Sequence, residues 1–292
     1  MALTDKLSAI GNAIRAKTGS TDMLTLEQMP SAIAGIQTGS GTSDDLAKKL
    51  ITGEGDITEI PSDITKIKDF AFYLSKNLKL TSLPSGITAI GEYTFYNCEN
   101  LALTSLPSGL TSIGQFAFCG CKNLVLTSLP NGITNIDGGA FWDCNKIALT
   151  YLPSGIVWIK ANTFNQCPNL ALTSLPAGVT RIYGGAFHQC GRLALTSLPD
   201  GVTIIGDEAF YRCLNITLTS IPSSVISIGS NAFNSCTGLT TITFKGTPTS
   251  IASDAFQACT KLTTINVPWA EGAVANAPWG AINATINYNT TT

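Results

Sequence analysis

Cysteine offers the widest chemical repertoire of the residues in this 292-residue chain, which contains nine of them. Zinc sites use closely spaced pairs such as C-x2-C, and the nearest pair, Cys119 and Cys121, has no partner motif. A disulfide framework would have to join neighbouring members of a regular series. We therefore interpret the cysteines as buried, reduced, small apolar groups whose S–H donates to a backbone carbonyl, and we expect no metal and no cofactor. Eight of them recur every 23 residues, at Cys98, Cys121, Cys144, Cys167, Cys190, Cys213, Cys236 and Cys259. Ser75 takes the same place one period earlier, where we expect its hydroxyl to be exposed.

The chain lacks the usual groups for acid–base catalysis. Its single histidine, His188, is interpreted as an exposed side chain rather than a proton carrier. No serine or cysteine has a neighbouring base that the repeat would bring to it, and adjacent carboxylates such as Asp207 and Glu208 are typical of solvated turns. No glycine-rich loop matches a phosphate-binding motif. This inventory predicts a protein that is not an enzyme.

Phenylalanine and proline share the 23-residue period of the cysteines. A period between 20 and 50 residues that persists along a chain is the signature of a solenoid, whose coils stack on their neighbours. We expect an α/β solenoid of about nine coils, in which short parallel strands alternate with helical or 3₁₀ turns. The repeated phenylalanines, here called the ladder phenylalanines, are Phe72, Phe95, Phe118, Phe141, Phe164, Phe187, Phe210, Phe233 and Phe256.

One coil, Cys98 to Gly120, shows how the period predicts local structure. Leu101 to Leu106 is predicted to be a short strand that ends at a Pro-Ser-Gly corner, because proline has no N–H to donate to a sheet. Leu110 to Ile113 is predicted to be a second extended segment. The segment Gln115 to Phe118 is too short for an α-helix, so we expect a helical or 3₁₀ turn that brings Phe118 inward.

The chain carries too little charge to attract an anionic polymer. Seventeen Lys and Arg stand against nineteen Asp and Glu, a formal net charge of −2, which disfavours nucleic acid and anionic membrane surfaces as partners. No segment approaches 18 consecutive apolar residues, and Met1 to Lys17 lacks the basic start and apolar run of a secretory signal. We therefore expect synthesis in the cytosol and no membrane insertion.

The unit C-x-x-L-x-L-x-x-L-P-x-G-[ILV]-x-x-I-G-x-x-A-F-x-x, intact from Cys98 to Gly120, resembles a leucine-rich repeat of the BspA or treponemal type. Cys236 to Phe244 and Cys259 to Pro268 match its commoner form more closely. The middle coils depart from it around positions such as Leu103, which leaves their strand register open. The resemblance covers residues 51–268 and implies a right-handed solenoid used for binding, often in bacterial surface adhesins, without catalysis.

The two ends of the chain carry a second resemblance. Apolar residues at helical spacing predict a helical hairpin within residues 1–38. Its phrases Leu7 to Gly19 and Met29 to Ile36 are similar to a small module of phage and prophage tail or minor structural proteins, and Val267 to Gly280 is similar to the ending of repeat proteins in those contexts. The predicted organisation is a docking or oligomerisation module over residues 1–38, a linker and cap over 39–50, the solenoid over 51–268, and a C-terminal cap or tail over 269–292.

Positions that vary from coil to coil are free to face a ligand. One variable column follows the ladder phenylalanines, and a second precedes the isoleucine that ends the second extended segment. Exposed aromatic rings beside Asn, Ser and Thr can stack on sugars or anchor a protein, whereas the alternative is that these rings only shield the side of the solenoid that carries the turns. The candidate binding residues are Tyr73, Tyr96, Trp142, His188 and Tyr211 in the first column and Trp158 and Arg181 in the second.

These observations predict a non-enzymatic recognition protein whose partner is a protein or a surface glycan. The terminal modules favour a phage or prophage tail-associated structural protein that contacts a bacterial surface, with a virion or extracellular location after assembly and a homo-oligomer formed through residues 1–38. One alternative is a BspA-like cell-surface adhesin that binds host protein or glycan. The other is a structural spacer or assembly protein without a ligand.

Overall fold

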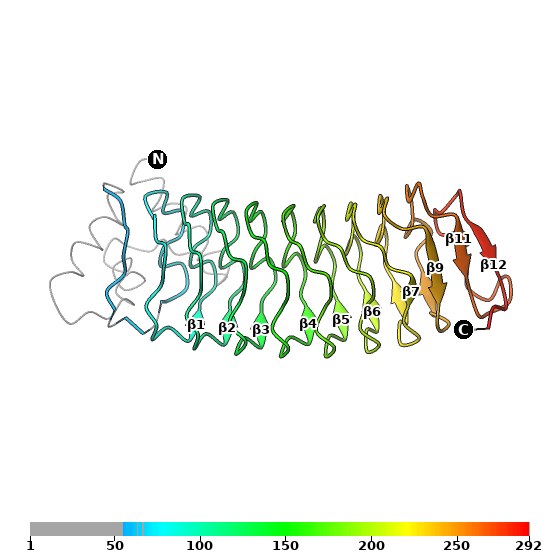
Figure 1. Ribbon diagram of the computed structural model, residues 1–292, viewed down its shortest axis with the longest axis horizontal. Coiled ribbons are helices and arrows are strands. Elements are labelled where there is room, and N and C mark those ends of the chain that lie inside the picture. The colour runs from blue at the N-terminus through cyan, green and yellow to red at the C-terminus, as the bar shows by residue number, and fades with distance from the viewer. Residues whose placement is uncertain (1–54, 63, 66, 292) are drawn as a thin grey trace, which may run out of the picture.

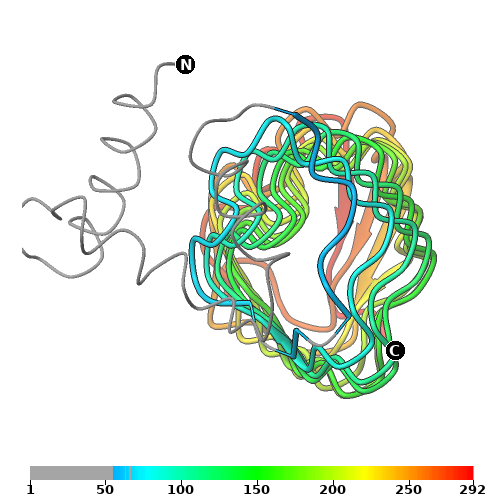
Figure 2. The same ribbon diagram turned by 90° about the vertical axis from the view of Figure 1, so that its left-hand side faces the viewer.

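Consecutive coils lie side by side along one axis in the computed structural model (Figure 1). The structure describes residues 55–62, 64–65 and 67–291. Viewed along the axis, the coils superimpose around a shared interior (Figure 2). The helical hairpin predicted over residues 1–38 and the cap predicted over 39–50 lie outside the described residues.

The second extended segment of each coil forms a parallel ladder, which confirms that part of the prediction. Residues 23 apart face each other, as Ala89 pairs with Ser112 and Ile90 with Ile113. In each strand the second residue is buried and the first is partly or fully exposed, as expected for a sheet with one face on the core. The strands of this side, here called the β face, are β1 (Ala89–Ile90), β2 (Ser112–Ile113), β3 (Asn135–Ile136), β4 (Trp158–Ile159), β5 (Arg181–Ile182), β6 (Ile204–Ile205), β8 (Ser227–Ile228) and β10 (Ser250–Ile251).

The first extended segment becomes a strand only toward the C-terminal end. The strands there are β7 (Ser220–Ile221), β9 (Thr241–Phe244), β11 (Thr264–Asn266) and β12 (Thr285–Asn287), paired in the order β7-β9-β11-β12. The strand predicted from Leu101 to Leu106 is not formed. In β9 the buried Ile242 and Phe244 are two residues apart, whereas the buried Leu103 and Leu106 are three apart. A strand cannot point both of those leucines to one side, because its side chains alternate with a period of two.

The opposite side of each coil is a run of turns, and no helix occurs within the described residues, so the predicted helical or 3₁₀ turn is not confirmed. Phe118 N–H donates to Ala140 O of the next coil at 2.8 Å, while Cys119 N–H donates to Phe116 O of its own coil at 3.2 Å. A helix would keep every N–H within its own coil. Phe116 and Gly120 adopt positive φ, 52° and 72°, in a segment that divides its donors between two coils.

The ladder phenylalanines form one continuous stack through the interior. All nine are at most 1% exposed, and consecutive ring centroids lie 5.2 to 5.7 Å apart with nearly parallel planes. Each ring therefore buries its faces against the neighbouring coils rather than against its own, so a single coil cannot form this core alone.

The cysteine ladder behaves as predicted. All nine cysteines are buried thiols, not disulfides. The eight ladder members each donate their S–H to the carbonyl oxygen of the ladder phenylalanine 26 residues earlier, at 2.9 to 3.1 Å. Ser75 at the corresponding position is only 3% exposed, so the expectation of a solvent-exposed hydroxyl is wrong.

The C-terminal segment continues the stack beyond the last ladder phenylalanine. Phe256 N–H donates to Trp279 O at 2.9 Å. In earlier coils the N–H of the ladder phenylalanine donates to a carbonyl of the following coil, so Trp279 takes the place of that coil. Trp279 is fully buried, with its ring 6.0 Å from that of Phe244. Strand β12 pairs with β11, so the end of the sheet is covered by one further strand.

Burial should make the cysteines unreactive in the native protein. Loss of hydration raises the pKa of Cys119, Cys190 and Cys259 to about 12, so the reactive thiolate is scarce at neutral pH. We expect a chromogenic aromatic disulfide, which releases a coloured thiolate for each thiol that reacts, to label none of the nine thiols of the folded protein and all nine in guanidinium chloride. Rapid labelling of even two thiols in the folded protein would contradict the buried ladder.

Two glycines on neighbouring segments provide a matched test of coil spacing. A Cβ at Gly114 would lie 2.6 Å from a backbone atom of Gly91, whereas a Cβ at Gly109 meets nothing within 4 Å. We expect Gly114→Ala to lower the free energy of unfolding by more than about 1 kcal/mol and Gly109→Ala to change it by less than about 1 kcal/mol. Chemical denaturation of both variants provides the measurement, and equal effects would contradict the close approach of the coils at Gly114.

Candidate functional site

The outer positions of the β face form the second variable column predicted from the sequence. In most coils this position carries a small or polar residue, such as Ala89, Ser112 or Asn135. Trp158 on β4 stands out, because its side chain is large and 46% exposed. The guanidinium of Arg181, the next member of the column, lies 6.0 Å from the centroid of the Trp158 ring. The structure therefore brings these two predicted binding residues together.

The parallel ladder of the β face is interrupted beside Trp158. Strands β1, β2 and β3 form one sheet, and β4, β5, β6, β8 and β10 form another, with no pairing between β3 and β4. On either side of this interval the same backbone bonds recur: Asp137 N–H donates to Ile113 O, and Tyr183 N–H donates to Ile159 O, both at 2.9 Å. The corresponding bond from Lys160 is absent between the two strands, which are visibly farther apart in Figure 1.

The opening is confined to the β face. On the turn-containing side of the same two coils, Gly139 N–H donates to Ala161 O at 2.9 Å. In the interior, the rings of Phe141 and Phe164 stack at 5.5 Å with an interplanar angle of 3°, as elsewhere in the ladder. The two coils are thus splayed like a wedge, open at the sheet and closed at the turns.

The second residue of each β-face strand is a buried isoleucine, here called the ladder isoleucine. The opening coincides with a loss of glycine at the position that follows it. Gly114, Gly206 and Gly229 occupy this position where the ladder is intact, and a Cβ on any of them would lie 2.5 to 2.6 Å from backbone of the preceding coil. Three consecutive coils instead carry a side chain there, and the ladder breaks within this run, between the first and second. The three residues are Asp137, Lys160 and Tyr183.

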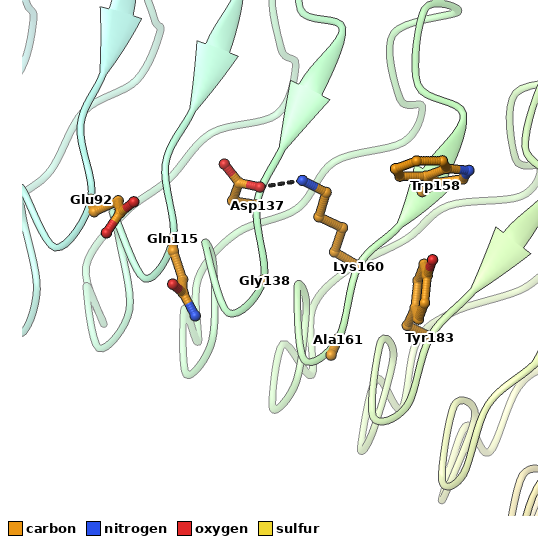
Figure 3. Close-up of a pocket in the computed structure, with 8 residues that line it drawn as sticks. All are labelled: Glu92, Gln115, Asp137, Gly138, Trp158, Lys160, Ala161 and Tyr183. Atoms are coloured by element: carbon orange, nitrogen blue, oxygen red, sulfur yellow. Dashed lines mark hydrogen bonds and ion pairs between the residues drawn. The ribbon is translucent and has the colours of Figure 1, made fainter. Parts of the chain in front are cut away.

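A groove of about 450 Å³ lies across the interruption. Figure 3 shows Lys160 extending toward Asp137, with which it forms an ion pair, while Trp158 and Tyr183 stand on the other side of Lys160. Asn135 Nδ2 donates to the second oxygen of Asp137 at 2.9 Å, which fixes the carboxylate. The groove is lined by Glu92, Gln115, Asp137, Gly138, Trp158, Lys160, Ala161 and Tyr183.

This groove offers binding groups but no reactive centre. Its side chains supply one large aromatic surface, a phenol, an amide and three charged groups, and no cysteine, serine or histidine. Within the described residues, no group of three or more His, Cys, Asp or Glu side chains could hold a metal ion. The same part of the chain contains no helix long and apolar enough to cross a membrane.

The first variable column, which follows the ladder phenylalanines, is packed more tightly than expected. Its predicted binding residues are only partly exposed, so the expectation of exposed rings is wrong for this column. Tyr73 stacks on Tyr96 with centroids 5.0 Å apart, and His188 stacks on Tyr211 at 4.7 Å. Rings one coil apart are close enough to cover each other, and the Trp142 ring lies 6.2 Å from that of Phe116 with a tilt of 35° between the planes. A ligand role for these residues stays a prediction.

His188 is also less accessible than predicted. Its side chain is 16% exposed, its Nε2 lies 3.6 Å from Glu208 Oε2, and its buried Nδ1 has no hydrogen-bond partner in the described structure. Burial lowers the pKa of His188, an effect partly opposed by the Glu208 carboxylate and reinforced by Arg212. The imidazole is therefore a packed, predominantly neutral ring at neutral pH.

Sequence reasoning missed three of the groove residues, Asp137, Lys160 and Tyr183. It treated the position after the ladder isoleucine as a repeated glycine rather than as a variable column. The signal was present, because glycine is replaced there in three successive coils. Glu92 and Gln115 were also missed: they lie at the next position along the chain, which the repeat unit leaves variable but which was not chosen as a column.

Stacked parallel coils with this repeat define a leucine-rich repeat solenoid. A family model described as a BspA type leucine rich repeat region matches residues 56–171 and 158–271. The chain belongs to this family, which confirms the resemblance seen in the repeat.

Two solved structures support the same fold. A leucine-rich repeat protein from Bacteroides ovatus ATCC 8483 is 25% identical with a TM-score of 0.64, and the match covers 80% of this chain and 61% of that one. A leucine rich cell surface protein from Faecalibacterium prausnitzii A2-165 is 24% identical with a TM-score of 0.51, covering 81% of this chain and 89% of that one. The chain thus spans 61% of the length of the Bacteroides ovatus protein. A search of curated proteins finds no match.

The environment of His188 generates a pH prediction. Because its folded pKa lies below the unfolded value of about 6.5, the unfolded state binds more protons as pH falls through this region. The stability contributed by the neutral ring is therefore complete above pH 6.5 and is lost as pH falls below it. We expect His188→Asn, which introduces the residue found at Asn165 and Asn234 of the same column, to lose less stability than the wild type between pH 7.5 and pH 5. A constant difference in melting temperature across this range would contradict the assignment.

Proposed function

We propose that this chain is a non-enzymatic recognition protein of the surface-adhesin kind, which binds a protein or glycan through its β face. The observation that carries the proposal is the exposed Trp158 beside the interrupted ladder. A large aromatic ring costs free energy when it is left in water on an otherwise polar column, and a partner that covers it recovers that free energy.

The departures from the repeat support this reading, since they gather in one coil. Tyr151 replaces a serine of the neighbouring coils, Val157 replaces their threonine, and Lys160 stands at the position that is glycine two coils away on either side. Tyr151, Val157 and Trp158 are 45%, 48% and 46% exposed. Leu214, Ile226 and Ile282, the other exposed large apolar side chains of the described residues, lie in other parts of the solenoid. Three such groups in a single coil are more than a spacer needs, whereas a binding surface uses them.

Membership of the BspA-type family is compatible with a place at the cell surface, and the Faecalibacterium prausnitzii protein of similar fold is described as a cell surface protein. The phage or prophage tail role rests on residues 1–38, which lie outside the described residues, and on the resemblance of Val267 to Gly280. Neither the family match nor these two structures supports it, so the tail role and the homo-oligomer stay predictions. The adhesin role is therefore the one that we adopt.

Binding to surfaces tests the proposal. Fluorescent full-length protein is titrated onto bacterial cells, isolated cell-wall polysaccharide, epithelial cells and immobilised extracellular-matrix proteins. We expect saturable binding to at least one of these surfaces, weakened tenfold or more by Trp158→Ser, which corresponds to the loss of about 1.4 kcal/mol or more.

Tyr151→Ser is the matched control, because it removes an aromatic ring of nearly equal exposure from the same coil and also restores the residue of neighbouring coils. We expect it to change affinity by less than about twofold if Trp158 is the anchor. Absence of saturable binding by folded wild-type protein would favour the spacer alternative. Equal loss in both variants would contradict the placement of the binding surface at Trp158.

A further inference from the structure

We propose that the interval between β3 and β4 is a saccharide subsite that takes neutral pyranose units, with Trp158 as its stacking platform. The inference rests on the proposed recognition function and names the ligand class of the same groove. It depends on four features of the interval: its unpaired backbone groups, its aromatic surface, its balanced charge and its length.

The interruption frees backbone groups that are bonded at every comparable position nearby. In the two adjacent intervals, Thr134 N–H donates to Thr111 O and Thr180 N–H donates to Val157 O. The equivalent bond from Val157 N–H to Thr134 O is absent between β3 and β4. Lys160 N–H likewise lacks its bond to the preceding strand. The edges of the interval therefore present donors and acceptors together, which suits hydroxyl groups because each hydroxyl both donates and accepts.

Trp158 provides the apolar half of the site. One face of a pyranose ring carries mainly C–H groups and stacks on an aromatic ring, while the hydroxyls at its rim stay in plane for hydrogen bonding. Figure 3 places the Lys160 and Asp137 side chains on one side of the indole and Tyr183 next to it, so polar groups adjoin the platform. Arg181 Nη1 donates to the hydroxyl of Tyr183 at 3.4 Å, which helps to hold the phenol in place.

The charges of the interval favour a neutral ligand. Lys160 and Asp137 form an ion pair with both side chains 31% exposed, so each is largely compensated while its remaining hydrogen-bonding capacity faces the groove. Glu92 is the remaining charged residue of the lining, and Arg181, which lies beside Trp158 outside the lining, is opposite to it in sign. A sialylated, sulfated or phosphorylated chain would meet no excess of positive charge here.

The length of the groove favours an oligosaccharide over a single sugar. The lining residues come from five successive coils, from Glu92 to Tyr183, and parallel strands stack at about 4.8 Å, so the groove extends on the order of 20 Å along the axis. A protein partner would instead require a broad apolar centre, and the groove holds one exposed indole within a polar rim.

An array of immobilised neutral and anionic oligosaccharides, probed with the full-length protein, tests the inference. The neutral oligosaccharide that binds best is then titrated by calorimetry and by tryptophan fluorescence. We expect binding to neutral oligosaccharides, with a change in fluorescence that disappears in Trp158→Ser, because Trp269 and Trp279 are buried and Trp142 does not line the groove. Tyr151→Ser serves again as the variant that leaves the groove intact.

Lys160→Gly tests the opened interval itself, because it restores the glycine of the regular coils. We expect this variant to fold with an unchanged or raised melting temperature and to bind the neutral oligosaccharide at least tenfold more weakly. Lys160→Met keeps the side-chain bulk and removes the charge, and we expect it to retain more affinity than Lys160→Gly.

The outcomes separate this inference from the proposed function. Binding to anionic oligosaccharides alone, or to a protein surface in the cell assay without any neutral oligosaccharide, would overturn the neutral-saccharide subsite and leave the recognition role standing. No binding to any array member or surface would overturn both. Neutral-oligosaccharide binding that survives Trp158→Ser and Lys160→Gly would place the subsite elsewhere and overturn this assignment.

Discussion

The need of every coil to share backbone hydrogen bonds with its neighbours governs this molecule. No coil satisfies its own N–H and C=O groups, as the turn-containing side shows by sending alternate donors to the next coil. The bonded groups must recur at a fixed interval, and 23 residues is that interval. The phenylalanine stack and the cysteine S–H bonds follow the same interval because they join neighbouring coils in the same way.

This constraint determines where function can develop. A residue that bonds or stacks between coils cannot change without disturbing two neighbours, whereas an outward residue of the β face can. The interval between β3 and β4 goes one step further, because the backbone bonds themselves are lost there. Each lost bond forgoes about 0.5 to 1.5 kcal/mol. The wedge can persist because the bonds of the turns and the stack of Phe141 on Phe164 still join the two coils.

The sequence predicts what repeats and misses what depends on contacts between unlike coils. The solenoid, the buried phenylalanines and the cysteine–carbonyl bonds could be predicted, since each needs only the period and the chemistry of one residue. The conformation of the turn segment could not be predicted. A helix and a run of turns whose N–H groups donate alternately to their own coil and to the next one have the same spacing of apolar residues. The stacking of His188 on Tyr211 depends on which ring happens to lie one coil away. The interrupted ladder was least accessible, because Asp137 and Tyr183 also replace the glycine and still bond to the preceding strand, so the loss of glycine alone does not locate the break.

The cost of the interruption is itself an argument for its role. Natural sequences keep their local choices consistent with the fold, and departures concentrate where function requires them. Lys160 departs from the glycine of the regular ladder, and Val157 and Trp158 add exposed apolar surface in the same coil. All three changes reduce the regularity of the solenoid, and none of them fills the core. A coil that served only to lengthen the stack would gain nothing from them, whereas a coil that holds a ligand between two opened strands gains the space, the platform and the free backbone groups together.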